Sequence, residues 1–515
     1  MNGATSLVKT FLAAGVDTIF ANPGTSEMHF VAALDSHPEM KCVLCLFEGG
    51  TTGAADCYFR MKRDVSGTLL HLAPGLGNAF ANLHNARKAH SGMVNVVGDH
   101  ATHHLRYESP LKGDVAGLSQ TLSHWTYASG DASRVAADGA AAVRAARGGN
   151  GQIATLILPA DTAWEEGGAP VLAHEPPAEL HRPSAQAIEA AAAQLRASGA
   201  ALMIGGPALF GPLRDLAGQI AAVTGCRLMA DTLIPRLSKG AGTAKLQQLI
   251  YAVTPKMAQM AELTSITLVG CDRPVAFFAY PGKPSTPEPA GCAVLQLTAP
   301  QDDIEWTLSA LADAVGVTAK TEAARMPLDI PALPEGTLTL EKVGQALAAL
   351  MPEGAVFCNE AVSSGPKILP PLGAARPHET LGGTGGAIGW SLPGAVGAAI
   401  ACPDRKVIAV TGDGSAMYTL QSLWTMARES LDVTVIVLAN RGYQILRDEL
   451  TNVGVNSYGQ NARAMFDVEN PTLDWVALGR GHGVPGVRVE SAEAFAKAVQ
   501  DGLSSDGPSL IEVVV

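Results

Sequence analysis

Two oxygen-bearing side chains in the C-terminal third of the chain could hold a divalent cation. Asp413 lies just past an expected strand at 406–411, and Asn440 lies at the carboxyl end of the next expected strand, at 433–439. An expected helix at 420–428 joins the two strands, so they should run parallel and end at one edge of a sheet. A carboxylate and an amide oxygen, completed by a backbone carbonyl, water and two phosphate oxygens, would satisfy octahedral Mg²⁺.

The glycines around Asp413 point to the same chemistry. Gly412 and Gly414 would let the backbone approach a phosphate group, and the helix that follows would direct its amino end toward that group. The alternative is a structural turn with a capping asparagine. A Gly-Asp-Gly run alone is weak evidence, but an asparagine at the end of the next strand favours a diphosphate and metal site.

A second candidate group lies near the N-terminus. Glu48 ends an apolar strand at 42–47 and opens a helix at 48–61 that is rich in small residues. A carboxylate in such an apolar setting suits proton transfer. The alternative is an acid at a helix start that interacts only with the helix dipole.

The elements that must position these groups fall into three segments of alternating strands and helices. Proline-rich linkers at 167–183 and 326–334 separate the segments. This alternation predicts an α/β protein with three doubly wound parallel-sheet domains. Their expected ranges are 1–165, 184–325 and 338–515.

Composition excludes several classes of protein. Of the 515 residues, 47% are hydrophobic and 16% are charged, which excludes a disordered chain. The net charge is −12 and the basic residues are scattered, so no nucleic-acid surface is indicated. Apolar stretches are too short to cross a membrane, and the N-terminus lacks a signal-peptide pattern. We therefore predict a cytoplasmic protein.

The stretch from Gly412 through Ser415, together with Asn440 through Tyr443, resembles the cofactor motif of thiamine-diphosphate enzymes. The resemblance implies that Asp413, Asn440 and the carbonyl of Gly442 bind Mg²⁺. The resemblance covers nearly the whole chain and implies the three domains of that family. These are a pyrimidine-binding domain, a central domain and a diphosphate-binding domain, in that order. The residues that it assigns to the cofactor are Glu48, Ser363, Ser364, Gly386, Ile388, Gly412, Asp413, Gly414, Ser415, Asn440, Gly442 and Tyr443.

Two further motifs fit this family. Ile388, in a glycine-rich run, matches the bulky aliphatic residue that bends the cofactor into a V, and the carbonyl of Gly386 would hold the 4′-amino group of the pyrimidine. Ser363 and Ser364 lie in the loop that contacts the diphosphate in the family. For Ile388 the alternative is an ordinary core residue, and for the serines an ordinary turn.

Glu48 matches the family's catalytic glutamate, with Tyr58 and Arg60 following as they do there. That glutamate hydrogen-bonds N1′ of the pyrimidine. It comes from a different chain than the diphosphate site, so the resemblance implies a homodimer at least. We expect a dimer of dimers, that is, a homotetramer.

Two expected loops resemble the benzoylformate decarboxylase branch. Thr25 follows Asn22-Pro23-Gly24 and takes the place of a hydroxyl that could hold the substrate carboxylate. His71 opens the expected loop 71–78, four residues before Gly75-Leu76-Gly77-Asn78, and is a candidate proton shuttle. The alternative for His71 is a satisfied loop histidine. With Glu48, these are the predicted catalytic residues.

The chain also departs from that branch. Phe277 or Phe278 stands where a second active-site histidine is expected, and Glu449 stands where an apolar pocket wall is expected. An apolar lining could admit a second carbonyl, as in the acetolactate synthase branch. The predicted function is decarboxylation of a small 2-oxo acid, with aldehyde release or carboligation.

Three other readings stay open. The chain could be an acetolactate synthase-like carboligase or a non-catalytic member of the family. A Rossmann dehydrogenase is disfavoured because no strand runs into the required glycine fingerprint. FAD binds the central domain of some relatives, but Gly205-Gly206-Pro207 is too little to support it.

Overall fold

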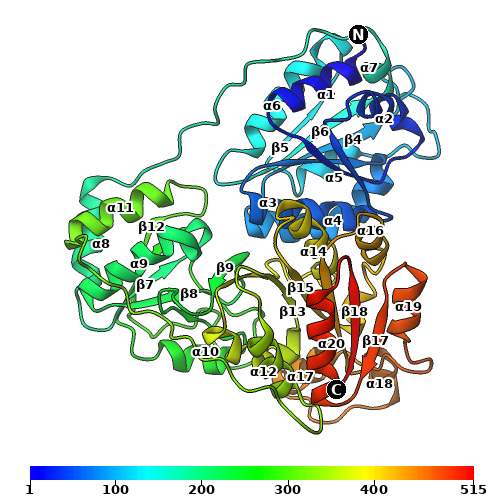
Figure 1. Ribbon diagram of the computed structural model, residues 1–515. Coiled ribbons are helices and arrows are strands. Elements are labelled where there is room, and N and C mark those ends of the chain that lie inside the picture. Colours follow the sequence, from blue (N-terminus) through cyan, green and yellow to red (C-terminus); the bar gives the residue numbers. More distant parts are fainter.

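The computed structural model describes residues 1–515 and contains three sheets, each covered by helices on both faces (Figure 1). The predicted α/β class is confirmed. No helix is both long and apolar enough to cross a bilayer.

The first sheet is parallel throughout and has the order β2-β1-β3-β4-β6-β5. Its strands are β1 (Thr18–Ala21), β2 (Lys41–Leu44), β3 (Ser66–Leu70), β4 (Met93–Asp99), β5 (Trp125–Ala128) and β6 (Ile153–Pro159). Helices α1 (Gly3–Ala13) and α6 (Val135–Ala146) pack together on one face. Helices α3 (Glu48–Lys62) and α4 (Leu72–Ala89) cover the other face, toward the third sheet (Figure 1).

The second sheet is also parallel, with the order β10-β8-β7-β11-β12. Its strands are β7 (Ala200–Ile204), β8 (Arg227–Ala230), β10 (Gln247–Gln248), β11 (Ser265–Val269) and β12 (Ala293–Thr298). The helices around it are α8 (Ala185–Leu195), α9 (Gly211–Thr224), α10 (Val253–Met260) and α11 (Ile304–Val315).

The third sheet has the order β17-β18-β16-β15-β13-β14-β9. Its strands are β13 (Val356–Glu360), β14 (His378–Gly382), β15 (Val407–Gly412), β16 (Val433–Ala439), β17 (Gly486–Val489), β18 (Ser509–Val514) and β9 (Arg236–Lys239). All pairs are parallel except β9 with β14. Strand β9 lies between β8 and β10 in the chain, so a segment from the second sheet's region completes the edge of the third.

Helices cover both faces of this third sheet. Helices α12 (Leu340–Leu350) and α20 (Ala492–Ser504) pack on one face. Helices α14 (Ser391–Ala401), α16 (Ser422–Arg428) and α19 (Trp475–Gly481) lie on the other, where their side chains share a core with α3 and α4. The first and third sheets are therefore joined by a layer of helices (Figure 1).

Glycines allow the helices of this layer to approach closely. A β-carbon at Gly397 of α14 would stand 1.9 Å from the carbonyl oxygen of Ala54 in α3. One at Gly53 would stand 2.8 Å from the ring of Pro393. The small residues that follow Glu48 are thus explained by backbone contact with α14.

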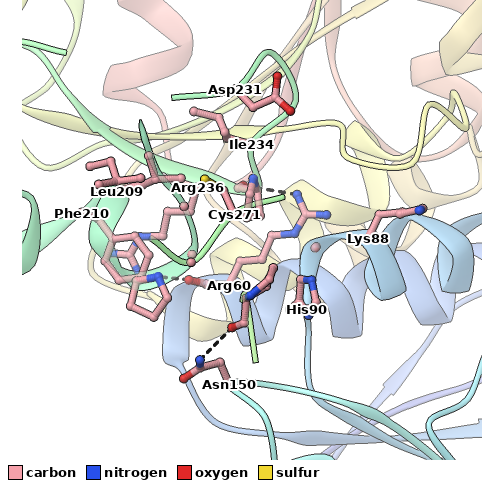
Figure 2. A pocket seen from close by; sticks show the side chains of 18 of the residues that line it. Arg60, Lys88, His90, Asn150, Leu209, Phe210, Asp231, Ile234, Arg236 and Cys271 are labelled. Atoms are coloured by element: carbon pink, nitrogen blue, oxygen red, sulfur yellow. Dashed lines mark hydrogen bonds between the residues drawn. The ribbon is translucent and has the colours of Figure 1, made fainter. Parts of the chain in front are cut away.

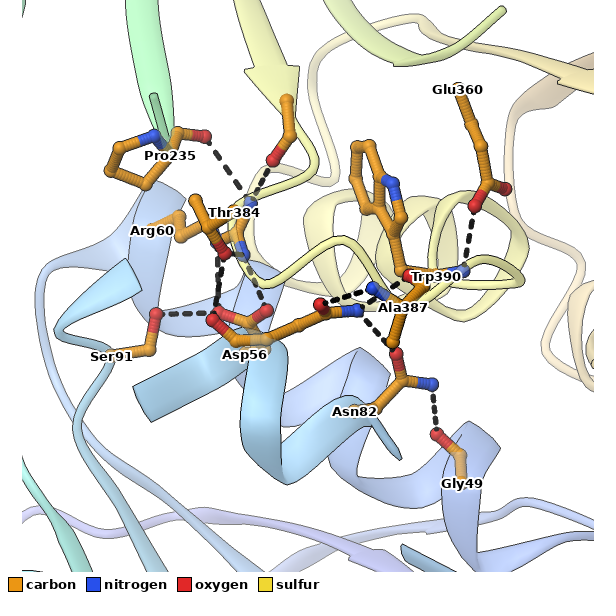
Figure 3. Close-up of polar contacts among 12 residues, drawn as sticks. Gly49, Asp56, Arg60, Asn82, Ser91, Pro235, Glu360, Thr384, Ala387 and Trp390 are labelled. Atoms are coloured by element: carbon orange, nitrogen blue, oxygen red, sulfur yellow. Dashed lines mark hydrogen bonds and ion pairs between the residues drawn. The ribbon is translucent and has the colours of Figure 1, made fainter. Parts of the chain in front are cut away.

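A buried ion pair in α3 connects parts of all three segments (Figure 3). Arg60 pairs with Asp56 at 2.6 Å, and both side chains are 2% exposed. The Arg60 guanidinium also donates to the carbonyl of Gly382 at 2.7 Å and to that of Pro235 at 3.3 Å. It donates to the Thr384 hydroxyl at 3.3 Å as well. The arginine thus holds the chain leading into the Gly386 loop.

Helix α4 holds the same loop from the other side. The Asn85 amide donates to the carbonyl of Ala387 at 2.9 Å and accepts from its N–H at 3.2 Å. The Thr384 hydroxyl donates to the backbone oxygen of Asn85 at 2.7 Å. The position of residues 384–387 is therefore set by the helices of the first sheet.

One expected loop is wrong. Residues 72–78 lie in the first turns of α4, which begins at Leu72 directly after His71. The prediction failed because Pro74 and the glycines read as helix breakers. Proline is tolerated in the first turn, where its missing N–H has no intrahelical partner. Leu72 adopts a left-handed conformation, with φ 47°, as the chain turns into this helix.

The junction around Arg60 predicts a large stability effect. Arg60→Met would leave the Asp56 carboxylate buried without its cation and remove the donors to Gly382 and Pro235. We expect a loss of about 3–5 kcal/mol in the free energy of unfolding, measured by denaturant titration. Lys62→Met, on the same helix but exposed, is the matched control and should change stability by less than about 0.5 kcal/mol. An Arg60→Met protein as stable as this control would contradict the assignment.

Candidate active site

The loops that follow β15 and β16 meet at the carboxyl edge of the third sheet. The two strands pair in parallel, with Gly412 opposite Leu438. Asp413 follows β15, and its Oδ2 accepts from the backbone N–H of Arg441, directly after Asn440, at 2.7 Å. The structure therefore brings Asp413 and Asn440 to one place.

The environment of Asp413 favours a cation. The residue is 3% exposed, and no lysine or arginine pairs with its carboxylate. Its Oδ1 accepts from the Gly414 N–H at 2.8 Å. Burial raises its pKa, although backbone donors at Gly414 and Arg441 lower it in part. The charge of Arg441, whose guanidinium pairs with Glu469, lowers the pKa only as a lesser cause, so the carboxylate is left without an ion-pair partner.

The donor set around Asp413 fits Mg²⁺. Asn440 supplies an amide oxygen, which accepts from the Gly442 N–H at 3.3 Å, and Gly442 supplies a buried backbone carbonyl. No group of three or more histidine, cysteine or acidic side chains in the chain is placed to hold a metal ion. A metal at this edge would therefore complete its shell with water and ligand oxygens, as Mg²⁺ does when it bridges phosphates.

The remaining residues predicted for this edge lie on segments at the carboxyl ends of β13, β15 and β16. A β-carbon at Gly414 would lie 2.5 Å from Cε1 of Tyr443, so the tyrosine ring lies against the glycine backbone. Ser415 is buried in the short helix α15 (Asp413–Ala416). Ser363 and Ser364 lie in the 3-10 turn Val362–Ser364 beyond β13, with Ser364 buried and Ser363 half-buried.

A buried carboxylate that sequence reasoning missed organises this edge. Glu360 ends β13 and accepts from the backbone N–H groups of Gly389 at 2.7 Å, Trp390 at 3.2 Å and Ser391 at 3.3 Å. It also accepts from the hydroxyls of Ser391 at 2.7 Å and Thr411 at 3.2 Å. Burial raises its pKa, and these donors lower it in part. The signal available in the sequence was an acidic residue shortly after the apolar run 355–358.

Glu360 thereby fixes the loop that carries Gly386 and Ile388. Gly386 has φ 77°, a conformation that favours glycine, and Ile388 is half-buried beside the residues that Glu360 holds. Strands β13 and β15 pair in parallel, with Glu360 opposite Thr411. The loop of Ile388 and the edge of Asp413 are therefore parts of one hydrogen-bonded unit.

Glu48 lies elsewhere, at the first residue of α3. It is 7% exposed, and its Oε2 accepts from the Asn78 amide at 3.0 Å. A β-carbon at Gly75 would lie 3.2 Å from its Oε1, so the glycine leaves room beside the carboxylate. The segment 75–78, wrongly expected to be a loop, thus contacts Glu48 from the start of α4.

His71 has a partner that sequence reasoning did not identify. Glu27, whose side chain is 2% exposed, accepts from Nδ1 of His71 at 2.9 Å. The Gly24 N–H donates to the same Glu27 oxygen at 2.7 Å. Because the carboxylate accepts the hydrogen bond from Nδ1–H, Nε2 of His71 is left to exchange a proton with another group. Thr25, in the neighbouring turn, is exposed.

The predicted site residues therefore form two groups in this chain. Glu48 contacts Asn78 at the start of α4, whereas the Gly386 loop contacts Asn85 on the same helix. Seven residues of helix correspond to about 10 Å along its axis. No hydrogen bond joins Glu48, His71 or Thr25 to the edge that holds Asp413 and Asn440.

The run Gly205-Gly206-Pro207 lines a cavity between the first two segments and β9 (Figure 2). Arg63, Lys88 and Arg236 give the cavity a basic lining, and its volume is about 140 Å³. Pockets for small organic ligands usually span about 300–1,000 Å³. The volume of this cavity lies below that range.

Two family models match the chain. Residues 1–124 match the N-terminal thiamine pyrophosphate-binding domain of thiamine pyrophosphate enzymes. Residues 371–513 match the C-terminal thiamine pyrophosphate-binding domain. Thiamine pyrophosphate is another name for thiamine diphosphate, so the predicted cofactor is confirmed.

Curated relatives match over the full length. A candidate acetolactate synthase large subunit, IlvX, of Mycobacterium tuberculosis is 45% identical over 524 residues, which cover 100% of this chain and 99% of the relative. Benzoylformate decarboxylase of Pseudomonas aeruginosa is 28% identical over 523 residues, with 97% of this chain and 96% of the relative covered.

Solved structures share the fold. The 4-hydroxybenzoylformate decarboxylase of Rhodococcus jostii superposes with a TM-score of 0.87 at 24% identity and covers 100% of this chain and 99% of its own. Benzoylformate decarboxylase of Polynucleobacter necessarius gives a TM-score of 0.85 at 22% identity, with the same coverage. The matched domains and the full-length relatives together show that this chain belongs to the thiamine-diphosphate-dependent enzymes.

Proposed function

We propose that the protein decarboxylates a small 2-oxo acid with thiamine diphosphate and Mg²⁺, and releases the product as an aldehyde or ligates it to a second carbonyl. The observation that carries this proposal is the buried Asp413 carboxylate, which has no ion-pair partner, beside Asn440 at the carboxyl edge of the third sheet. The two curated relatives, one from each branch of the family, support it.

Residues of the third sheet would hold the cofactor. Asp413, Asn440 and the Gly442 carbonyl would bind the metal, which neutralises the buried charge of Asp413. The residues proposed for the diphosphate are Ser363, Ser364, Gly412, Gly414, Ser415 and Tyr443. Gly386 and Ile388, whose loop Glu360 fixes, would receive the pyrimidine. When bound, thiamine diphosphate supplies an electron sink for the pair left by departing CO₂.

Residues of the first sheet would handle the protons and the substrate. Glu48 would hold the proton at the pyrimidine N1′, because its carboxylate is buried and keeps one oxygen free of Asn78. His71 would move a proton at Nε2, while Glu27 fixes its ring through Nδ1. The exposed Thr25 hydroxyl would orient the substrate carboxylate.

We infer that a complete site needs two chains. In one chain Glu48 and Asp413 belong to separate groups, and the segments that carry them expose apolar side chains. Leu46 is 45% exposed and Phe80 is 37% exposed near Glu48, and Tyr418 is 55% exposed near the Gly389 loop. Exposed apolar surface of this kind marks interfaces. A homodimer, and beyond it a dimer of dimers, would cover these residues.

An acetolactate synthase-like carboligase is the second candidate. Phe277 is the observation that favours it, because its ring lies against Gly386. A phenyl ring offers no titratable proton to the product carbon. Product analysis with one oxo acid alone and with an added aldehyde distinguishes the two candidates.

Turnover and cofactor binding test the proposed function together. With thiamine diphosphate and Mg²⁺, the wild-type protein should release CO₂ from at least one of pyruvate, benzoylformate and branched 2-oxo acids. Asp413→Ala should weaken cofactor binding, measured by calorimetry, by at least about tenfold, because the metal loses its anionic ligand. Asp404→Ala, an exposed acid at the opposite end of β15, is the matched control. The absence of turnover combined with unchanged binding in Asp413→Ala would reject the proposal.

The raised pKa of Asp413 gives this binding a pH dependence. A proton competes with the metal for the carboxylate, and burial raises the pKa of that carboxyl above its ordinary value of 3.8. Mg²⁺-dependent cofactor binding should therefore weaken as the pH falls, beginning above the range of an ordinary aspartate. Calorimetric titration over a pH series measures this, and an affinity that does not change on acidification would contradict the assignment.

Glu48→Gln separates cofactor binding from catalysis. Glutamine keeps an oxygen that accepts from Asn78 but removes the ionisable group. We expect cofactor affinity to change little, whereas kcat falls by at least about tenfold. Glu39→Gln, at an exposed acid before β2, serves as the control. Unchanged kcat in Glu48→Gln would refute the role proposed for this residue.

A further inference from the structure

A loop of the central segment lies over the candidate cofactor site. A β-carbon at Gly386 would lie 2.8 Å from Cζ of Phe277, so the phenyl ring rests on the backbone of this glycine. Any other residue at 386 would displace the ring. Phe277 is 38% exposed, and its neighbour Phe278 is 54% exposed, so the loop forms a surface cover and not part of a buried core.

The loop is attached to the third segment through a carboxylate. Glu449 lies in α17 (Gln444–Asn452), the helix that follows the Asn440 loop. Its Oε2 accepts from the hydroxyl of Tyr280 at 2.9 Å, and its Oε1 accepts from that of Tyr251 at 3.4 Å. Both tyrosines come from the central segment. We call Glu449, Tyr251 and Tyr280 the carboxylate clasp.

The clasp acts on Phe277 through ring packing. The ring centroid of Tyr251 is 5.2 Å from that of Phe277, and the two rings are tilted by 50°. Phe278 meets the other side of Phe277 edge to face at 4.8 Å. A continuous series of contacts therefore runs from Glu449 through Tyr251 to Phe277 and ends on Gly386.

The electrostatics of the clasp keep both hydroxyl groups protonated. Burial and the Glu449 charge raise the pKa of Tyr251 and of Tyr280. The tyrosines therefore remain donors throughout the physiological pH range. Hydrogen bonds to an ionised acceptor are stronger than neutral ones. An otherwise exposed loop is thus held in one position.

We propose that Glu449 is a positioning residue that holds Phe277 over Gly386 through Tyr251 and Tyr280, and so directs the reaction toward carbon–carbon bond formation. The proposal rests on the proposed function. The phenyl ring supplies no proton and excludes water from the face it covers. A neutral carbonyl compound can approach an apolar surface where a protonated side chain or water would otherwise stand.

The two outcomes differ only in what the product carbon receives. When CO₂ leaves, the carbonyl carbon of the donor keeps the bonding electron pair. In one outcome that carbon takes a proton and an aldehyde is released. In the other it forms a bond with the carbonyl carbon of a second substrate, whose oxygen takes the proton, and a 2-hydroxy ketone or acetohydroxy acid is released. Both outcomes consume one proton and need no oxidant or reductant.

The first measurement tests the clasp without the cofactor. Hydrogen–deuterium exchange of the backbone around residues 272–285 should be slow in the wild-type protein. It should become at least about threefold faster in Glu449→Ala and in Tyr280→Phe. Asp448→Asn changes the exposed neighbouring carboxylate on the same helix and should leave exchange unchanged. Equal exchange in all four proteins would overturn the clasp.

The second measurement follows product partition with thiamine diphosphate, Mg²⁺, a 2-oxo acid and an added aldehyde. We expect the wild-type protein and Asp448→Asn to convert most of the decarboxylated donor, counted by the CO₂ released, into ligated product. The ratio of ligated product to free aldehyde should fall at least about threefold in Glu449→Ala. Glu449→Gln, which can still accept from one tyrosine, should give an intermediate ratio. Phe277→His should favour free aldehyde most strongly.

The contrary results are distinct. CO₂ release with the same product ratio in every variant would overturn the positioning role and leave the proposed function standing. A wild-type protein that releases only aldehyde would also overturn the positioning role. If the wild-type protein binds the cofactor but releases no CO₂ from any oxo acid, the proposed function fails and this inference fails with it.

Discussion

The candidate site depends on one buried carboxylate. Glu360 lies at the end of β13 and accepts hydrogen bonds from the loop that opens α14 and from Thr411 at the end of β15. A buried acid is tolerated only when its oxygens are satisfied, so these segments must stay where they are. That constraint holds the Ile388 loop beside the strand that presents Asp413. Hydrogen bonds thus join the edge that carries Asp413 and the Ile388 loop into one unit, as a site that holds a cofactor in one conformation would need.

The helix layer between the first and third sheets imposes a second constraint. Glycines bring α3 and α14 into backbone contact, and Arg60 fixes the start of the Gly386 loop. This packing fills the space between the two sheets within one chain and leaves Glu48 apart from Asp413. No hydrogen bond within one chain joins Glu48 to the edge that carries Asp413. Under the proposed function, the carboxylate that this edge lacks would come from another chain.

The sequence predicted local elements better than contacts. Strand 433–439 was predicted with the bounds observed, since an apolar run with turn residues at both ends defines a buried strand. The sequence predicted that Asp413 and Asn440 lie close together, because the carboxyl ends of adjacent parallel strands meet at one edge of the sheet. Glu27 and Glu360 were missed because an isolated acid in a sequence does not reveal which distant donors surround it. Strand β9 joins a sheet from another segment, and no local pattern shows that pairing.

The account makes the active site a property of two chains, and complementation tests this directly. Glu48→Gln and Asp413→Ala proteins, each inactive alone, are co-expressed with different tags and purified as mixed assemblies. A site built from Glu48 of one chain and Asp413 of the other is intact once in every mixed dimer. With random pairing, the mixture should regain about a quarter of wild-type CO₂ release, and the tag-purified mixed dimer about half. Mixed assemblies that remain as inactive as the two parent variants would contradict the account, because they would place Glu48 and Asp413 in the same site of one chain.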